Sequence, residues 1–249
     1  MKINSIEKCF KIIELLSKNP QGLKLSEISN MLNFANSTTH HILRTLYPTD
    51  YISQDPETKR YSLGFRFLEI SKHILDNIDI RKIAGSYLRD LHTKCREAVH
   101  LAILRNGKVI YIDKVDSPGR LSLDTYIGFA TDPHAAAGGK VLLSELRHER
   151  VMDIYRDRPL KIYGKNTITN LSQLFEELEN IRKQGYAIDN EEYYEGIRCV
   201  AAPVRAGGKI VAAISITGSI FSMSMERIRE ELIDRVMKTA EQISLELCW

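Results

Sequence analysis

Residues 25–63 read LSEISNMLNFANSTTHHILRTLYPTDYISQDPETKRYSL. Apolar residues recur at helical spacing over 25–32, which predicts a short amphipathic helix. Residues 33–36 break this pattern, and a second helix is expected over 37–46. Two helices joined by a short turn form a helix-turn-helix unit, whose second helix can lie in the major groove of DNA.

The second helix carries small hydroxyl and basic side chains on the side that its apolar residues leave free. Threonine can contact a thymine methyl group or a phosphate, and arginine can bind guanine or phosphate. A serine that opens each helix would accept an unpaired backbone N–H, and the remaining N–H groups suit phosphate oxygens. The residues of the two helices expected to contact DNA are Ser26, Ser37, Thr38, Thr39, His41 and Arg44.

A hairpin is expected directly after the second helix. Residues 51–54 and 60–63 alternate like strands around an Asp-Pro-containing turn, and Lys59 and Arg60 lie at its tip. Such a basic hairpin is the wing of a winged helix and would contact the DNA backbone or minor groove. Alternatively, the helix pair is only core packing, but the full order of leading helix (5–18), helix, turn, helix and basic wing favours DNA binding.

The leading helix bears on the oligomeric state. Part of its apolar face belongs to the core of the N-terminal DNA-binding domain, which we call the head. Ile3 and Ile6 would suit an interface between two copies of the chain. The net charge is only +3 over 249 residues, and acidic side chains dilute the positive charge of the head. A single head is therefore expected to bind DNA weakly, and a dimer on a palindromic operator is expected.

Composition excludes several other classes of protein. No apolar run approaches the roughly 18 residues of a membrane span, and the first residues lack a signal-peptide pattern. The four cysteines are scattered without paired spacing, so neither a zinc site nor a disulfide framework is indicated. We expect a cytoplasmic protein with no metal, no cofactor and no membrane partner.

The chain changes character after the hairpin. Residues 64–77 predict a helix that is stiffer than a flexible tether and follows the wing directly. The expected domains are a winged helix-turn-helix domain at 1–63, a linker helix at 64–78 and an α+β domain with an antiparallel sheet at 79–249. In the last domain, strands are expected at 99–104, 109–115, 121–129, 186–189, 198–204 and 209–217, and helices at 80–96, 135–146, 149–155, 171–184 and 225–247.

Several blocks of the chain together resemble the isocitrate lyase regulator (IclR) family of bacterial transcription factors. The blocks are Leu25–Ile28, Ser37–Leu43, Tyr61–Gly64, Asp132–Lys140, Ile181–Glu192 and Glu195–Val204. The resemblance implies a winged-helix head, a linker helix and a GAF-like effector-binding domain, assembled as a homodimer or homotetramer. It departs from the family pattern at His41, where arginine is usual, and at Pro48, where the family is usually helical. A neutral histidine offers at most one donor in place of the arginine fork.

The resemblance also implies an effector site made of Ala137, Gly138, Asp189, Cys199, Ser215 and Thr217. The chemistry of these residue types suits a small organic acid, such as a keto or hydroxy acid. The small residues near 137 let a ligand approach the backbone, and a helix starting there would offer N–H groups to an anion. The two hydroxyl residues lie two apart on a strand and face the same side. Alternatively, these residues serve packing alone: the Gly-Gly pair allows a helix to pack closely, and Cys199 is a small buried hydrophobic residue.

These expectations describe a sequence-specific regulator, with repression of a catabolic operon expected and a small acid as allosteric effector. One alternative is an enzyme with Cys199 as nucleophile, Asp189 as orienting acid and His134 as base, although their spacing matches no nucleophile motif. Another is an architectural DNA-binding protein without an effector. His100 and His134 have no partner at ligand spacing, so no metal is expected. The Tyr193-Tyr194 pair is either a loop over the pocket or plain surface, and surface is favoured.

Overall fold

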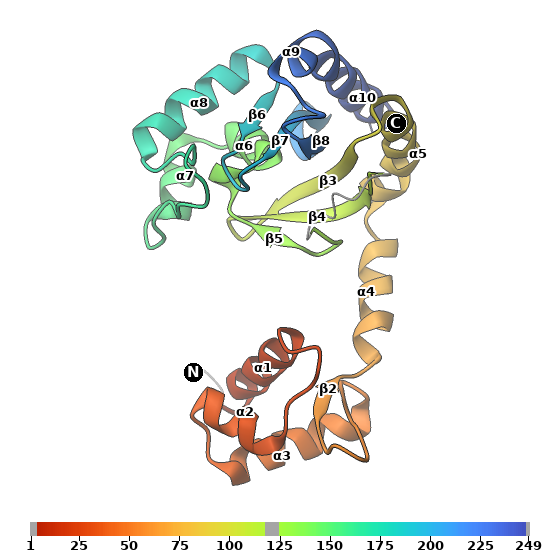
Figure 1. Ribbon diagram of the computed structural model, residues 1–249, viewed down its shortest axis with the longest axis vertical. Helices are drawn as coiled ribbons and strands as arrows, with labels where there is room; N and C mark the ends of the chain where they lie inside the picture. The colour runs from red at the N-terminus through yellow and green to blue at the C-terminus, as the bar shows by residue number, and fades with distance from the viewer. Residues whose placement is uncertain (1–3, 118–124, 248–249) are drawn as a thin grey trace. The chain divides into compact units, whose positions relative to one another are not determined.

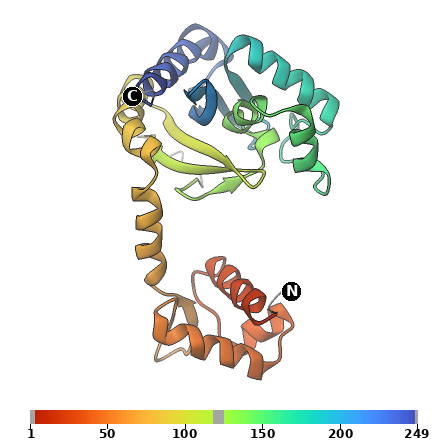
Figure 2. The ribbon, with the colours of Figure 1, turned by 180° about the vertical axis from the view of Figure 1, so that it is seen from behind.

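The computed structural model describes residues 4–117 and 125–247. The chain divides into two compact units, residues 1–77 and 78–249, which Figures 1 and 2 show from opposite sides. Within the described residues, no helix combines the length and the apolar composition needed to cross a membrane.

The first unit is a helix-turn-helix head with a hairpin (Figure 1). Its elements are α1 (Asn4–Ser17), α2 (Leu25–Leu32), α3 (Asn36–Leu46), a 3₁₀ turn (Tyr47–Thr49), β1 (Ile52–Gln54), β2 (Tyr61–Leu63) and α4 (Arg66–Asp76). The apolar positions that predicted the helices form one core, made of Ile12, Leu16, Leu23, Ile28, Leu43 and Ile52. The segment before α2 joins the hairpin through a bridge between Leu23 and Tyr61, so the wing is tied to the helices.

Helix α2 begins at Leu25, as the apolar pattern predicted, and α3 begins at Asn36, one residue before the prediction. The residue before α2 is Lys24, whose backbone N–H donates to Glu27 Oε2 at 2.7 Å. The residue before α3 is Ala35, whose carbonyl accepts the N–H of Thr39. Ser26 and Ser37 therefore lie inside the first turns and do not cap the helices as predicted. In α2, the Glu27 carboxylate takes the capping role that we had assigned to a hydroxyl.

The segment that leaves the hairpin packs closely on Asp50, which lies just before the hairpin. Asp50 has a left-handed backbone, and its carbonyl accepts the N–H of Arg66 at the start of α4. A Cβ on Gly64 would lie 2.0 Å from the Asp50 carbonyl oxygen. Only glycine fits there, which explains why the wing passes into α4 through this residue.

The second unit contains a six-stranded antiparallel sheet in the order β5-β4-β3-β8-β7-β6. Its strands are β3 (Ala98–Arg105), β4 (Lys108–Val115), β5 (Ala130–Thr131), β6 (Ala187–Asn190), β7 (Ile197–Ala206) and β8 (Lys209–Ser219). Its helices are α5 (Asp79–Cys95), α6 (Ala137–Ser144), α7 (His148–Tyr155), α8 (Leu171–Gln184), α9 (Met225–Arg227) and α10 (Ile233–Glu246), with a 3₁₀ turn at Pro133–Ala135 and a π turn at Ile228–Leu232.

Helices cover both faces of this sheet (Figures 1 and 2). On β7 and β8, alternate residues point to opposite faces: Val200, Ala202 and Ile214 pack with α5 and α10, whereas Ala201 and Ala213 pack with α6 and α8. The alternation follows from the two-residue period of a strand. The fold is therefore α+β, as the order of predicted elements indicated.

The hairpin turns follow the sequence signals, but one strand differs. Asn106 and Gly107 both have positive φ, as the turn between β3 and β4 requires. Of the strand expected at 121–129, residues 121–124 lie outside the described residues and 125–129 are not extended into a strand. At this edge β5 pairs with Val109 and Ile110, and Tyr111 exchanges backbone hydrogen bonds with Gly128 and Phe129.

Candidate functional sites: a DNA-reading face and a cavity beside the sheet

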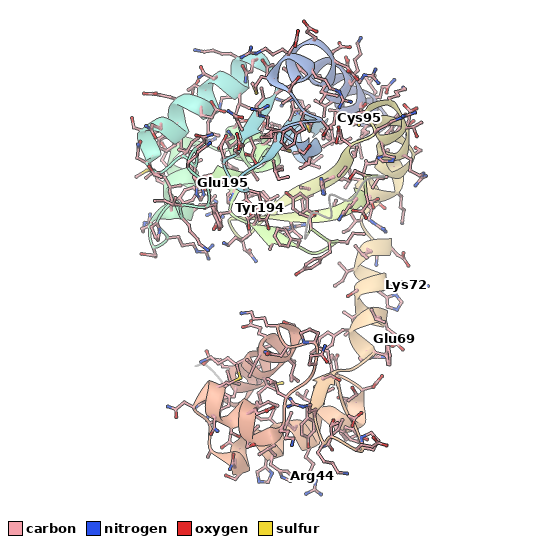
Figure 3. All side chains as sticks on the ribbon, viewed as in Figure 1. Arg44, Glu69, Lys72, Cys95, Tyr194 and Glu195 are labelled. Atoms are coloured by element: carbon pink, nitrogen blue, oxygen red, sulfur yellow. The ribbon has the colours of Figure 1, made fainter. Side chains whose placement is uncertain are left out.

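The outer face of α3 presents the side chains expected to contact DNA, with one exception. Ser37, His41 and Arg44 are exposed and Thr38 is half-buried. Figure 3 shows Arg44 extending away from the head into solvent. Ser26, on α2, is also exposed. This face is polar and carries exposed N–H donors, as a groove-reading helix requires.

Thr39 is the exception. It is fully buried, and its hydroxyl accepts a 2.8 Å hydrogen bond from the Ser29 hydroxyl and lies 3.4 Å from the Ala35 carbonyl. The prediction that Thr39 contacts DNA is corrected: it joins α3 to α2. The signal was present in the sequence, because Thr39 lies one helical turn before the core residue Leu43 and so shares its face.

The wing also divides its two basic residues between two roles. Lys59 is exposed at the turn. The Arg60 guanidinium instead donates to the Gly22 carbonyl at 2.8 Å and grips both carboxylate oxygens of Glu27, at 3.0 and 3.3 Å. Arg60 therefore fixes the wing to the start of α2, and its contact with DNA stays a prediction.

An acidic residue shapes the turn of the wing. Asp55 Oδ1 accepts the backbone N–H groups of Glu57 and Thr58, at 3.0 and 2.6 Å, and the Thr58 hydroxyl at 2.8 Å. These bonds, that from the Thr58 N–H foremost, lower the pKa of Asp55. The carboxylate that diluted the positive charge in the sequence therefore orders the loop that presents Lys59.

In the second unit, three predicted effector residues form one row across the sheet. Asp189 on β6 is paired with Cys199 on β7, which is paired with Thr217 on β8. Directly paired residues of antiparallel strands point to the same face. The Thr217 hydroxyl donates to Cys199 Sγ at 3.2 Å. Strand register therefore places Asp189 and Thr217, which are 28 positions apart in sequence, in one row on one face of the sheet.

Helix α6 begins beside this row. Ala137 and Gly138 are its first two residues, and the first N–H bonded back into the helix is that of Lys140, to the Ala136 carbonyl. A Cβ on Gly139 would lie 2.3 Å from the Pro133 carbonyl oxygen, whereas one on Gly138 would only touch Ala213 at 3.6 Å. Gly139 therefore serves close packing, while at Gly138 a Cβ would make only an ordinary contact.

The row Asp189–Cys199–Thr217 and the start of α6 line a small cavity, which we call the sheet cavity. Its volume is about 40 Å³, enough for about three waters at 10–15 Å³ each. Its lining comes from β3–β8, from α6 and from the segments beside them: His100, Tyr111, Thr125, Phe129, Thr131, Ala136, Ala137, Gly138, Asp189, Tyr193, Tyr194, Ile197, Cys199 and Thr217.

Five of the six predicted effector residues therefore share one cavity. Ser215 does not line it: this residue is buried one rung further along β8, paired with His100 and Ala201. The sequence interpretation also missed two kinds of wall. His100 lies on β3, Tyr111 on β4, and Phe129, which stacks on Tyr111, directly precedes β5; none of them carried a local signal for the cavity.

The tyrosine pair that we had assigned to the surface belongs to the cavity wall as well. Tyr193 stacks on Tyr163, with ring centroids 4.4 Å apart, and Tyr194 meets Tyr193 edge-on. Both lie on the loop between β6 and β7, where Figure 3 labels Tyr194. Tyr194 is 40% exposed, so this loop separates the cavity from solvent.

Burial sets the charge state of the cavity. Desolvation and the neighbouring Glu192 raise the pKa of Asp189 to about 7. Burial, together with the positive charge of Lys114, lowers the pKa of His100 to about 4, so its ring is neutral. Burial raises the pKa of Cys199 to about 12. The cavity therefore offers hydroxyls, a neutral ring, backbone N–H groups and a carboxyl that titrates near neutrality.

The contacts of His134 and Cys199 do not form a nucleophile and its base. Among the described residues, a His134 ring nitrogen bonds the Lys161 carbonyl at 3.0 Å, and the ring lies against Tyr155 and Tyr163. Cys199 instead bonds Thr217, and its protonated thiol is a poor nucleophile. Across residues 4–117 and 125–247, no cluster of three potential metal ligands is found.

The model of the bacterial transcriptional regulator IclR C-terminal domain matches residues 72–245, and the IclR helix-turn-helix model matches residues 5–56. The chain belongs to the IclR family. The regulator XynR of Escherichia coli K12 is 32% identical over 92% of this chain and 93% of its own length. The repressor AllR of the same organism is 28% identical over 98% of this chain and 90% of its own length.

Solved structures of the family share the fold. The Thermotoga maritima IclR matches with a TM-score of 0.81 and 32% identity, covering 100% of both chains. An IclR homolog from Microbacterium hydrocarbonoxydans, complexed with 4-hydroxybenzoate, matches with a TM-score of 0.82 and covers 98% of this chain and 99% of that one. At 18% identity the second likeness concerns the fold alone. The protein is thus a DNA-binding transcriptional regulator with the IclR architecture.

Proposed function

We propose that this regulator is a repressor whose affinity for its operator falls when a small hydroxylated carboxylic acid enters the sheet cavity. The observation that carries the proposal is the meeting of the first turn of α6 with the row Asp189–Cys199–Thr217 inside one cavity. The N–H groups at the helix end suit a carboxylate. The carboxyl of Asp189 and the hydroxyl of Thr217 suit the ligand's own hydroxyl or carbonyl groups.

The walls support the same class of ligand. Tyr111 and Phe129 stack at a centroid distance of 5.9 Å and provide flat apolar contact. A pocket with apolar walls and a few convergent polar groups is the usual design of a small-molecule site. The hydroxybenzoate bound by the homolog from M. hydrocarbonoxydans combines these features: a ring, a carboxylate and a hydroxyl.

Two copies of the head would be needed to grip a palindromic operator. The described part of α1 exposes Ile6 and Phe10, which are 49% and 59% accessible, and α4 exposes Leu68 and Ile74. Apolar side chains at helical spacing, left uncovered in one chain, suit a seam with a second copy. We therefore infer a homodimer or a homotetramer. We also infer that it works in the cytoplasm and controls adjacent catabolic genes.

Fluorescence anisotropy of a labelled duplex tests the proposal. The full chain is titrated onto a duplex from its own promoter region and onto a scrambled duplex, at two salt concentrations. The promoter duplex should bind more tightly, with an affinity that falls steeply as salt rises. 4-Hydroxybenzoate, pyruvate and D-galacturonate are then added separately, and at least one of them should release the duplex.

A matched pair of variants ties the response to the cavity. Thr217→Ala removes a cavity hydroxyl and should leave operator binding intact while weakening the response to the acid by about tenfold. Thr239→Ala removes a buried hydroxyl of α10, which bonds the Arg235 carbonyl, and should change neither property. Equal binding of both duplexes would contradict DNA recognition. A response that survives Thr217→Ala unchanged would contradict the cavity.

A further inference from the structure

A charged side chain lies fully buried one turn beyond the helix end that faces the cavity. Lys140 is 1% exposed. Its ammonium group donates to Glu192 Oε1 at 2.6 Å, to the Ile188 carbonyl at 2.7 Å and to Glu177 Oε1 at 3.2 Å. Burial opposes the charge, but the attraction of Glu192 and Glu177 prevails and raises the pKa of Lys140. Burying an ammonium group is costly, so its partners indicate a specific role.

Glu192, the main partner, anchors the loop between β6 and β7 through its backbone N–H, its backbone carbonyl and one carboxylate oxygen, Oε1. Its N–H donates to Asp189 Oδ1 at 2.7 Å. Its carbonyl accepts the Thr167 hydroxyl at 2.6 Å and the Gly164 N–H at 3.2 Å. Its side chain binds Lys140. The next two residues of the chain are the tyrosines of the cavity wall, so fixing Glu192 fixes where they begin.

Lys140 and the cavity are also joined through α6. The residues that line the cavity, Ala137 and Gly138, occupy the first turn of the same short helix. Asp189, which accepts the Glu192 N–H, lines the cavity as well. The cavity is small, at about 40 Å³, so the position of its wall bears on which ligands can enter. The wall segment that carries Tyr193 and Tyr194 is held at its base by this ion pair.

We propose that Lys140 is a positioning residue for effector recognition: through Glu192 it holds the loop 190–197, and with it the two tyrosines, against the sheet cavity. The inference rests on the proposed function for the identity of the cavity as the effector site. It assigns to Lys140 no contact with the effector. It makes the buried ion pair the element that sets how readily the wall opens.

Hydrogen–deuterium exchange of the full chain without any effector tests this role. In Lys140→Met, Glu192 would be left buried without its counter-charge, and it would be neutral at low pH and charged at high pH. Protection factors in residues 190–197 should fall more than about tenfold relative to the parent protein at pH 8, and by a smaller factor at pH 5.5. The double variant Lys140→Met with Glu192→Gln should regain protection at pH 8, because the neutral amide removes the unpaired buried charge.

Loss of protection that is equal at both pH values, or that the double variant does not repair, would assign Lys140 to packing alone and overturn the proposal. Unchanged protection at pH 8 would overturn it as well. Glu192→Gln alone keeps Lys140 paired with Glu177 and should lower protection by a smaller factor. If Lys140→Met does not fold, this smaller loss tests the contact between Lys140 and Glu192 directly, and unchanged protection in Glu192→Gln would overturn the proposal. Since no acid is added, failure of the proposed effector would appear only in the anisotropy titrations.

Discussion

The Ser29 hydroxyl donates a 2.8 Å hydrogen bond to the Thr39 hydroxyl, joining α2 to α3 across the turn between them. Both side chains are buried, at 2% and 0% exposure. The bond therefore fixes how the recognition helix is presented without itself facing DNA. A residue of the helix that sequence reasoning assigned to the groove is part of the support for that helix.

Thr39→Val should destabilise the head by about 1–3 kcal/mol, because the Ser29 hydroxyl would remain buried without its acceptor. The measurement is the free energy of unfolding of the head, followed by chemical denaturation. Thr38→Val, at the half-buried neighbouring position, is the control and should leave stability within about 0.5 kcal/mol while weakening operator binding. Equal stability of the two variants would remove Thr39 from the head's core.

Arg44→Ala should weaken operator binding by about tenfold or more, since the exposed guanidinium is the strongest donor on the outer side of α3. Anisotropy titrations at several salt concentrations separate the two modes: a base contact alters sequence preference, and a phosphate contact lowers the salt slope by about one. Arg156→Ala, an exposed arginine of the second unit that pairs with Asp153, is the matched control and should have no effect on binding.

Adjacent glycines at the start of α6 should respond in opposite ways to alanine. Gly139→Ala places a methyl group 2.3 Å from the Pro133 carbonyl oxygen and should cost about 1–3 kcal/mol of stability. Gly138→Ala meets Ala213 at an ordinary 3.6 Å and should keep or slightly raise stability, while the methyl group narrows the cavity and reduces the acid response. Thermal unfolding and the anisotropy assay give the two readouts, and a reversed order would refute this assignment.

Asp189→Asn should stabilise the second unit at pH 8 but not near pH 4. Desolvation and Glu192, only partly offset by Lys140, raise the pKa of Asp189 from 3.8 to about 7. The folded state therefore holds this proton more tightly, and stability declines as pH rises from about 4 to about 7. The full cost is present above that window and is at most about 4 kcal/mol for three pH units. Asparagine cannot ionise, so chemical unfolding at the two pH values should show the gain only at the higher one.

The elements of the fold could be predicted because their signals are local. The Asn106-Gly107 turn and the alternating strands beside it follow from pairs of residues within a few positions of one another. The spacing of apolar residues that predicted each helix is local in the same sense. Residues 125–129, the described part of the strand expected at 121–129, show the limit: they do not form a strand, because an apolar run does not state whether a neighbouring edge will pair with it.

Side-chain roles were harder, because they depend on partners far away in sequence. The fold brings Arg60 to Glu27, 33 positions earlier, and no local pattern predicted this ion pair. Tyr111 and Phe129 enter the cavity wall from an edge of the sheet that no motif marks. The predicted row Asp189–Cys199–Thr217 came from the family resemblance, and strand pairing supplies its physical reason.

The row Asp189–Cys199–Thr217 also limits where the chain can tolerate insertions and deletions. One residue inserted or deleted within β7 between Cys199 and Val204 would turn half of the strand over and send the thiol or its neighbours to the opposite face. The structure places its irregularity elsewhere: the pairing of β7 with β8 shifts only between Val204 and Arg205, near the Gly207–Gly208 turn. Natural variants that gain or lose residues should therefore do so at that distal turn, leaving ligand selectivity untouched.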